Sequence, residues 1–138
     1  MADLIPRHYK KTITDALNTL SGAGTLKLAL FTSSYTPNAT NDELYSGLSN
    51  EVSNAGTNYT TGGNAISGGS SGYADTNNAY FDATDASWAA ATFTARYGVL
   101  YNTADSKIKA VFDFGGDKVV SGGTFTVVFN AGGLLKVS

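Results

Sequence analysis

The sequence predicts a mainly β domain built from antiparallel strands. Four segments in the second half of the chain are rich in Phe, Tyr, Val and Thr and are separated by turn-forming residues, a pattern typical of an antiparallel meander. Aromatic side chains can fill much of the core, since the chain has seven Phe, eight Tyr and one Trp. We expect the four strands at residues 78–83, 90–102, 108–115 and 124–130.

The chain of 138 residues divides into an N-terminal arm, residues 1–11, and a single β-rich domain, residues 12–138. Pro6 disfavours helix in the residue before it, so the start of the arm is expected to be extended. A short helix is expected over residues 7–20, because apolar side chains recur there at spacings of three and four. These side chains are Ile13, Ala16, Leu17 and Leu20.

Residues 25–32 alternate as a strand over a core should, with three leucines on one face. A second short helix is expected over residues 42–52, where Asn41 can cap its start. Seven Gly between Gly47 and Gly72 predict long surface loops, with a short strand near residues 64–67.

The longest expected strand, residues 90–102, is predicted to place one set of alternate side chains on the core. The glycine pairs at 115–116 and 122–123 are expected to bracket turns between later strands. The expected core set is Phe93, Ala95, Tyr97, Val99 and Tyr101.

Composition and charge bound the possible partners. The formal net charge is −2 and the nine basic residues form no long run, so nucleic acid is not an expected partner. The chain contains no Cys, which excludes disulfides and thiolate metal sites. The N-terminal segment has no apolar stretch long enough for a signal peptide or a membrane span, so we expect no membrane association. No cofactor and no metal ion are expected.

Candidate catalytic groups are few and scattered. His8 is the sole histidine, and it lies in the arm, where a general base could not be held in fixed geometry. Asp82 and Asp85 could act as paired carboxylates, but their spacing does not fit a calcium loop and Asp residues between strands usually cap turns. Asp113 and Asp117 flank a glycine pair and are interpreted in the same way.

Trp88 stands where a turn enters the long central strand. We interpret it as part of the core rather than as a platform for a ligand, because a buried Trp is a common anchor in β-sandwiches. The alternative is a sugar-binding face formed by Tyr73, Tyr80 and Trp88, which requires all three side chains to be exposed on one side.

The only basic cluster, Arg7, Lys10 and Lys11, has two interpretations. It is either the solvated start of a helix or part of an arm that docks on an acidic partner surface. In the second case the arm can add as a strand to a neighbouring sheet through main-chain hydrogen bonds. The expected partner-binding residues are Ile5, Arg7, His8, Tyr9, Lys10 and Lys11.

Three segments carry a resemblance to a known family: the opening MADLIPRHYKK, the block YFDATDASWAAATFTARYGVLYN and the ending FDFGGDKVVSGGTFTVVFNAGGLLKVS. Together they resemble the head decoration, cement or minor capsid proteins of tailed bacteriophages. The resemblance implies an antiparallel β-sandwich or jelly-roll-like domain, present in many copies at threefold positions of the capsid and often trimeric. The Gly- and Ser-rich residues 62–72 depart from the family pattern.

We therefore expect a virion structural protein rather than an enzyme. Its implied partners are the major capsid protein of a phage shell and further copies of itself, and its implied location is the capsid surface, after synthesis in the bacterial cytoplasm. The alternatives are a phage tail or fibre component, a carbohydrate-binding β-sandwich module and a small hydrolase. The hydrolase needs a convergent cluster of reactive side chains that the sequence does not supply.

Overall fold

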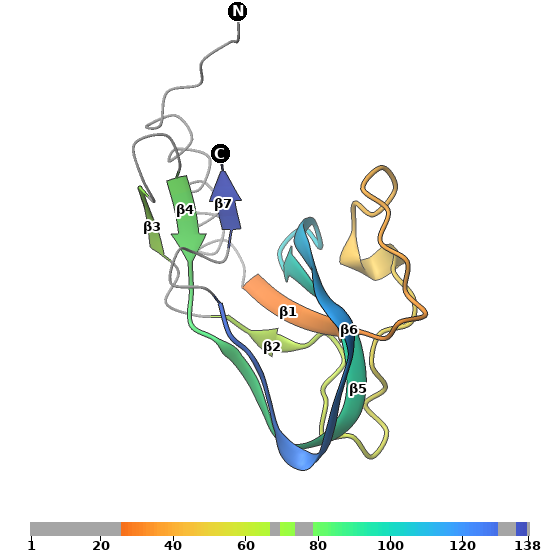
Figure 1. Ribbon diagram of the computed structural model, residues 1–138. Coiled ribbons are helices and arrows are strands. Elements are labelled where there is room, and N and C mark those ends of the chain that lie inside the picture. Colours follow the sequence, from red (N-terminus) through yellow and green to blue (C-terminus); the bar gives the residue numbers. More distant parts are fainter. Residues whose placement is uncertain (1–25, 67–69, 74–78, 130–134, 138) are drawn as a thin grey trace, which may run out of the picture.

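The computed structural model describes residues 26–66, 70–73, 79–129 and 135–137. This part of the chain is mainly β, as expected, and its strands form two antiparallel sheets (Figure 1). The first sheet has the strand order β2-β1-β5-β6 and the second has the order β3-β4-β7. The strands are β1 (Leu26–Phe31), β2 (Asn64–Ala65), β3 (Ser70–Tyr73), β4 (Ala79–Asp82), β5 (Ala86–Asn102), β6 (Ile108–Val127) and β7 (Leu135–Val137).

Strand β1 confirms the strand expected at residues 25–32, and β2 and β4 lie where short strands were expected. The helix expected over residues 42–52 is wrong, since that segment contains only a 3-10 turn, η1 (Tyr45–Gly47). Isolated bridges hold the residues on both sides of η1 in extended form, because Leu44 pairs with Lys107 and Glu51 pairs with Phe31. The arm at residues 1–11 and the helix expected over 7–20 lie outside the described residues.

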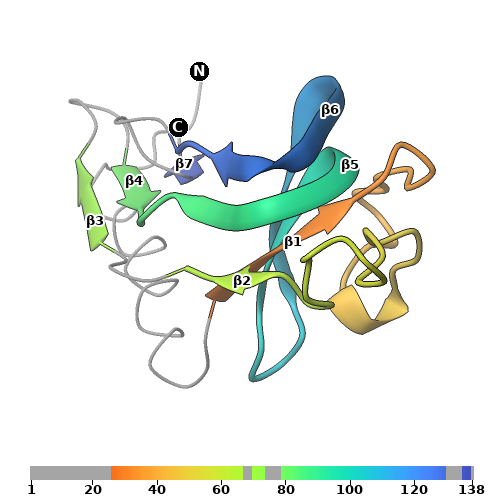
Figure 2. The ribbon, with the colours of Figure 1, turned by 90° about the horizontal axis from the view of Figure 1, so that it is seen from below.

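Strands β5 and β6 form one long, strongly curved hairpin (Figure 2). The strand expected at 108–115 and the first part of the one expected at 124–130 both belong to β6, which ends at Val127, and the glycine pairs at 115–116 and 122–123 are not chain-reversing turns. Instead they mark irregularities in the pairing with β5. Residues 114–117 all lie opposite Arg96, and Gly122 is an extra residue between the pairs that Ser121 and Gly123 form with β5. Such bulges bend a strand without ending it, which accounts for the curvature.

Both faces of the first sheet are covered over β1. Leu26, Leu28 and Leu30 belong to a larger core cluster on one face, whereas Ala29 and Phe31 belong to a smaller cluster on the other. Glycine-rich loops and residues from β5 and β6 complete the two clusters.

The single core face expected for β5 is therefore wrong in part. Phe93 and Ala95 pack in the larger cluster, but Val99 and Tyr101 pack in the smaller one. Leu100, which was expected on the opposite face of the strand from Phe93, packs with it in the larger cluster. The pairing irregularity between Ala95 and Tyr97 shifts the alternation of side chains by one residue. Beyond it both faces of β5 are buried.

Aromatic rings dominate the larger cluster. Trp88 is 3% exposed, which confirms that it belongs to the core. Its ring centroid lies 6.1 Å from that of Phe125, and Phe93 lies 5.0 Å from Phe125 and 5.8 Å from Tyr59. These contacts join the middle of the β5–β6 hairpin to the loop before β2.

Replacing Phe93 by Ala removes a ring that is 7% exposed from this cluster. We expect the variant to lose about 3–5 kcal/mol of unfolding free energy, as large aromatic truncations in cores do. Thr94→Ala is the matched control, since Thr94 is the exposed neighbour on the same strand and should change stability by about 0.5 kcal/mol or less. Urea unfolding of the three proteins measures the difference, and equal midpoints would contradict this placement of the core.

Candidate functional site

The Glu51 carboxylate joins the irregular loops to the sheet. Its Oε1 accepts hydrogen bonds from the Tyr59 hydroxyl at 2.6 Å and the Gly62 backbone N–H at 2.7 Å, and its Oε2 accepts one from the Tyr45 hydroxyl at 2.6 Å. The Tyr59 oxygen in turn accepts a hydrogen bond from the Leu30 N–H of β1. One charged group thus satisfies three donors from separate segments, and such charge-assisted bonds are stronger than neutral ones.

Two further tyrosine contacts close this cluster. Tyr101 of β5 donates to the Gly62 carbonyl oxygen at 2.8 Å, and its ring stacks on Tyr45 with centroids 4.1 Å apart. Burial raises the pKa of the Tyr59 hydroxyl, and the hydrogen bond to Glu51 acts in the same direction. Burial and Glu51 raise the pKa of Tyr45 in the same way. These hydroxyls therefore serve as stable donors rather than as acids.

The loop at residues 37–42 is fixed by its own hydrogen bonds. Asp42 Oδ2 accepts from the Tyr35 hydroxyl and from the Asn38 backbone N–H, both at 2.7 Å. Asn38 Oδ1 accepts from the N–H groups of Thr40 and Asn41, so the side chain shapes the turn. Burial, followed by the bond to Asp42, raises the pKa of Tyr35. The loop is preorganised, although most of its side chains are exposed.

The outer edge of β6 is covered at its start and open further along. The loop covers the start, where the Ile108 N–H donates to the Glu43 carbonyl oxygen at 3.0 Å and Leu44 forms a bridge with Lys107. Within the part of the chain that the structure describes, β6 pairs along its length with β5 only. A strand edge of this kind carries N–H and C=O groups that can bind another extended segment.

A groove of about 330 Å³ lies where the open edge begins. One wall is the preorganised loop, and the other is formed by the first four residues of the edge strand β6. Apolar atoms form most of its lining, with one acidic and one basic side chain. The lining residues are Pro37, Asn38, Ala39, Asp42, Ile108, Lys109, Ala110 and Val111.

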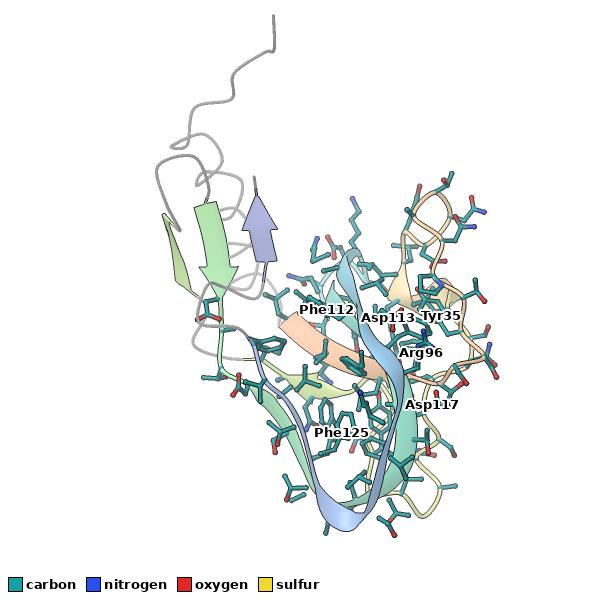
Figure 3. The ribbon with its side chains drawn as sticks, viewed as in Figure 1. Tyr35, Arg96, Phe112, Asp113, Asp117 and Phe125 are labelled. Atoms are coloured by element: carbon teal, nitrogen blue, oxygen red, sulfur yellow. The ribbon has the colours of Figure 1, made fainter. Side chains whose placement is uncertain are left out.

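An ion pair stiffens the edge beyond the groove. Arg96 Nε lies 3.1 Å from Asp113 Oδ1, directly beside the largest bulge of the hairpin (Figure 3). The hydrogen bond from Arg96, with a further one from the Gly115 N–H, holds the pKa of Asp113 below its usual value. Asp113 thus caps the bulge, as expected for an Asp beside a glycine pair.

Two apolar side chains, one within β6 and one directly after its last residue, are exposed to solvent. Val119 is 73% exposed and Val128 is 72% exposed. A second hollow of about 390 Å³ is lined by Phe114, Lys118, Phe125, Thr126, Val127 and Val128. Phe112 and Phe125 lie on the side of β6 opposite to Tyr35 (Figure 3). The strand therefore offers both an open edge and an exposed apolar end.

The expected partner-binding residues, Ile5, Arg7, His8, Tyr9, Lys10 and Lys11, lie outside the described residues.

The aspartates considered as paired carboxylates have other surroundings. Asp85 Oδ1 accepts a hydrogen bond from the Phe129 backbone N–H at 2.8 Å, so it ties the two ends of the hairpin together. Asp82 Oδ1 is buried without a hydrogen-bond partner. Trp88 is buried and cannot contribute to an exposed sugar-binding face. The structure describes the backbone of Tyr73 and Tyr80 but not their side chains.

Sequence reasoning missed Glu51 and the groove. Glu51 falls in the segment expected to be helical, and an acidic residue on the surface of a helix gives no signal of a binding role. Its hydrogen-bond donors lie 6, 8 and 11 residues away in the sequence. The groove brings together residues about 70 positions apart, and no local pattern signals such a contact. Only the high density of Tyr and Gly around Glu51 gives a hint.

Replacing Tyr59 by Phe should change how stability depends on pH. The folded state keeps this hydroxyl protonated above its ordinary pKa near 10, whereas the unfolded chain loses the proton there. Rising pH above about 10 thus favours unfolding by about 1.4 kcal/mol per pH unit for such a group. We expect the variant to show a shallower loss of stability between about pH 10 and 11.5, measured by urea unfolding. An unchanged slope would contradict the buried, hydrogen-bonded state of Tyr59.

A second prediction concerns Gly63, which has a φ of +75° and passes close to β1. A Cβ at this position would overlap the Leu28 carbonyl oxygen, so we expect Gly63→Ala to lose about 3 kcal/mol or more. Gly56 is the control, because it has a φ of +70° and open space around it. Gly56→Ala should cost only the backbone strain of about 1–2 kcal/mol. Thermal unfolding of both variants measures this difference, and equal losses would show that the close approach is absent.

No protein-family model matches the chain, and no match was found among curated proteins or among solved structures. Within the described ranges, no group of three or more His, Cys, Asp or Glu side chains is placed to hold a metal ion. None of the helices in those ranges is both long and apolar enough to cross a membrane.

Proposed function

We propose that this chain is a structural protein of a tailed-bacteriophage particle that binds the outer surface of the head and stabilises the shell. The observation that carries the proposal is the open edge of β6, next to a preorganised groove and followed by exposed apolar side chains. An edge of this kind binds a protein segment through main-chain hydrogen bonds, with side chains supplying specificity. The resemblance of three sequence segments to head decoration proteins supplies the identity of the particle.

The surface chemistry supports a protein partner. Charged residues make up only 14% of the chain, so contacts between copies and with a shell protein face little electrostatic repulsion. The surface of β5 and β6 carries Ser, Thr and Gly among a few apolar residues, a mixture suited to wide and adaptable contacts. The proposed partners are the major capsid protein and further copies of this chain.

The type of β fold and the number of subunits are part of the same proposal. Two antiparallel sheets joined through β4 and β5 agree with a β-sandwich or jelly-roll-like domain. In the assembled particle we place the domain on the capsid surface as a trimer, with the arm of residues 1–11 reaching toward neighbouring subunits. A trimer at a threefold position would present three arms and three β6 edges to the shell.

The proposal is tested by binding to phage heads. We expect a chain without residues 1–11 to fold as the full chain does but to lose binding to heads that lack this protein, because the arm supplies docking contacts rather than core. Co-sedimentation with purified heads measures binding, and circular dichroism shows that the truncated chain is folded. Phe93→Ala at a temperature where it remains folded is the control, since its defect is confined to the core.

Three outcomes overturn parts of this proposal. Saturation of heads by the truncated chain would contradict docking by the arm. Labelling of tails or fibres instead of heads, seen by electron microscopy with a tagged chain, would assign the protein to those structures. Retention of the chain on immobilised polysaccharides without affinity for any phage particle would favour a carbohydrate-binding module.

A further inference from the structure

The groove between the loop of residues 37–42 and the start of the β6 edge has the form of a site for one extended segment. Its lining combines Ile108 to Val111 of β6, the edge strand of its sheet within the described residues, with apolar atoms from both walls. The opposite wall is held by the two hydrogen bonds to Asp42, so a strand could enter without reordering the loop. Preorganisation of this kind reduces the entropic cost of binding.

The charge distribution of the chain indicates which segment fits. Residues 1–11 contain three basic side chains and one acidic one, a formal charge of +2, whereas residues 12–138 contain six basic and ten acidic side chains, a formal charge of −4. Two basic groups near the groove are already paired, since Lys109 lies 3.8 Å from Asp105 and Arg96 is bound to Asp113. Asp42 accepts only uncharged donors and, among the described residues, neither Asp42 nor Glu43 forms an ion pair, so these carboxylates can face a basic segment.

The sequence of the arm suits an edge and an apolar groove. Alternate side chains of a strand point to opposite sides, so one of the neighbours Leu4 and Ile5 must point toward the apolar lining whichever register is taken. Pro6 follows them and cannot donate a backbone hydrogen bond, which limits pairing to a short strand. The basic residues Arg7, Lys10 and Lys11 come next, where they can lie against the acidic loop.

The length of chain between the arm and β1 permits an exchange between subunits. Residues 12–25 could span at most about 50 Å, whereas a domain of this size has a radius of gyration of about 14 Å. An arm that binds the edge of a neighbouring subunit makes a contact between two different surfaces. Subunits joined by such contacts form a closed ring when the rotation that relates one subunit to the next returns to the first subunit. A trimer is the ring that the proposed function requires.

We propose that the arm, residues 1–11, of one copy binds the groove of a second copy, with the residues before Pro6 added as a short strand to the edge of β6, so that the arms link the subunits in a closed trimer. This inference deepens the proposed function, since it names the contact by which copies of the chain hold one another. It requires no phage head, and it can be tested on the isolated protein.

The test uses two introduced cysteines, because the chain has none of its own. Ala2→Cys lies in the arm and Ala39→Cys lies on the exposed wall of the groove. Each change is small and removes no hydrogen bond described above. The double variant is treated with a short bismaleimide and separated on a denaturing gel, and a mixture of the two single variants is treated in parallel.

We expect the double variant to give crosslinked products that end at the trimer, and the mixed single variants to give a dimer. The control pairs Ala2→Cys with Val128→Cys, which is equally exposed but lies outside the groove, and should yield little product. Crosslinks only within single chains would show that the arm returns to its own groove. Absence of any crosslink, or equal yield at Val128, would also overturn the inference.

Failure here is distinguishable from failure of the proposed function. Trimeric crosslinks in a protein that ignores phage heads would refute the capsid assignment and keep the contact between arm and groove. Binding to heads by a protein that gives no crosslinks would refute the exchange and keep the capsid assignment.

Discussion

The arrangement of this protein depends on a single carboxylate. Glu51 accepts hydrogen bonds from the Tyr45 and Tyr59 hydroxyls and from the Gly62 N–H, and so it fixes the long irregular segment between β1 and β2. Tyr45 then holds the neighbouring Leu44 against Lys107, which covers the first residues of the β6 edge and defines where the open part begins. A half-buried carboxylate with three donors is stabilising only while all three remain in place, because an unsatisfied charge in this position is costly. The loop that lines the groove is held separately, by the hydrogen bonds to Asp42 and Asn38.

The curved β5–β6 hairpin is the second constraint, and it follows from where glycine stands in the sequence. Gly115, Gly116 and Gly122 each have positive φ, so β6 can bulge there and still continue its pairing with β5. The same bulges interrupt the regular outer edge, which discourages uncontrolled pairing between free chains. A run of regular pairing from Ala110 to Asp113 lies between the irregularity at Lys109 and the bulge at residues 114–117, and its first two residues line the groove.

The sequence allowed the class of fold to be predicted but not its geometry. Alternation identified β1, and aromatic and β-branched residues identified most of β5 and β6, because both signals are local. Two errors have a common cause. The pairs Gly115–Gly116 and Gly122–Gly123 look the same in a turn as in a bulge, and only the partner strand decides between them. The shift of core face beyond Ala95 depends on the same pairing. The Glu51 cluster could not be predicted, because its donors are brought together by tertiary contacts.

These features together explain how an edge strand of this length can remain unpaired with another long strand among the described residues. An open edge risks aggregation unless it is short, charged, bulged or occupied. Here the loop covers one end, and pairing irregularities at Lys109, at residues 114–117 and at Gly122 divide the rest into short regular stretches, one of which begins beside the groove. An edge divided into such short stretches favours a short partner strand over a long one. The preorganised groove beside one of these stretches is the physical reason to expect the short arm strand there.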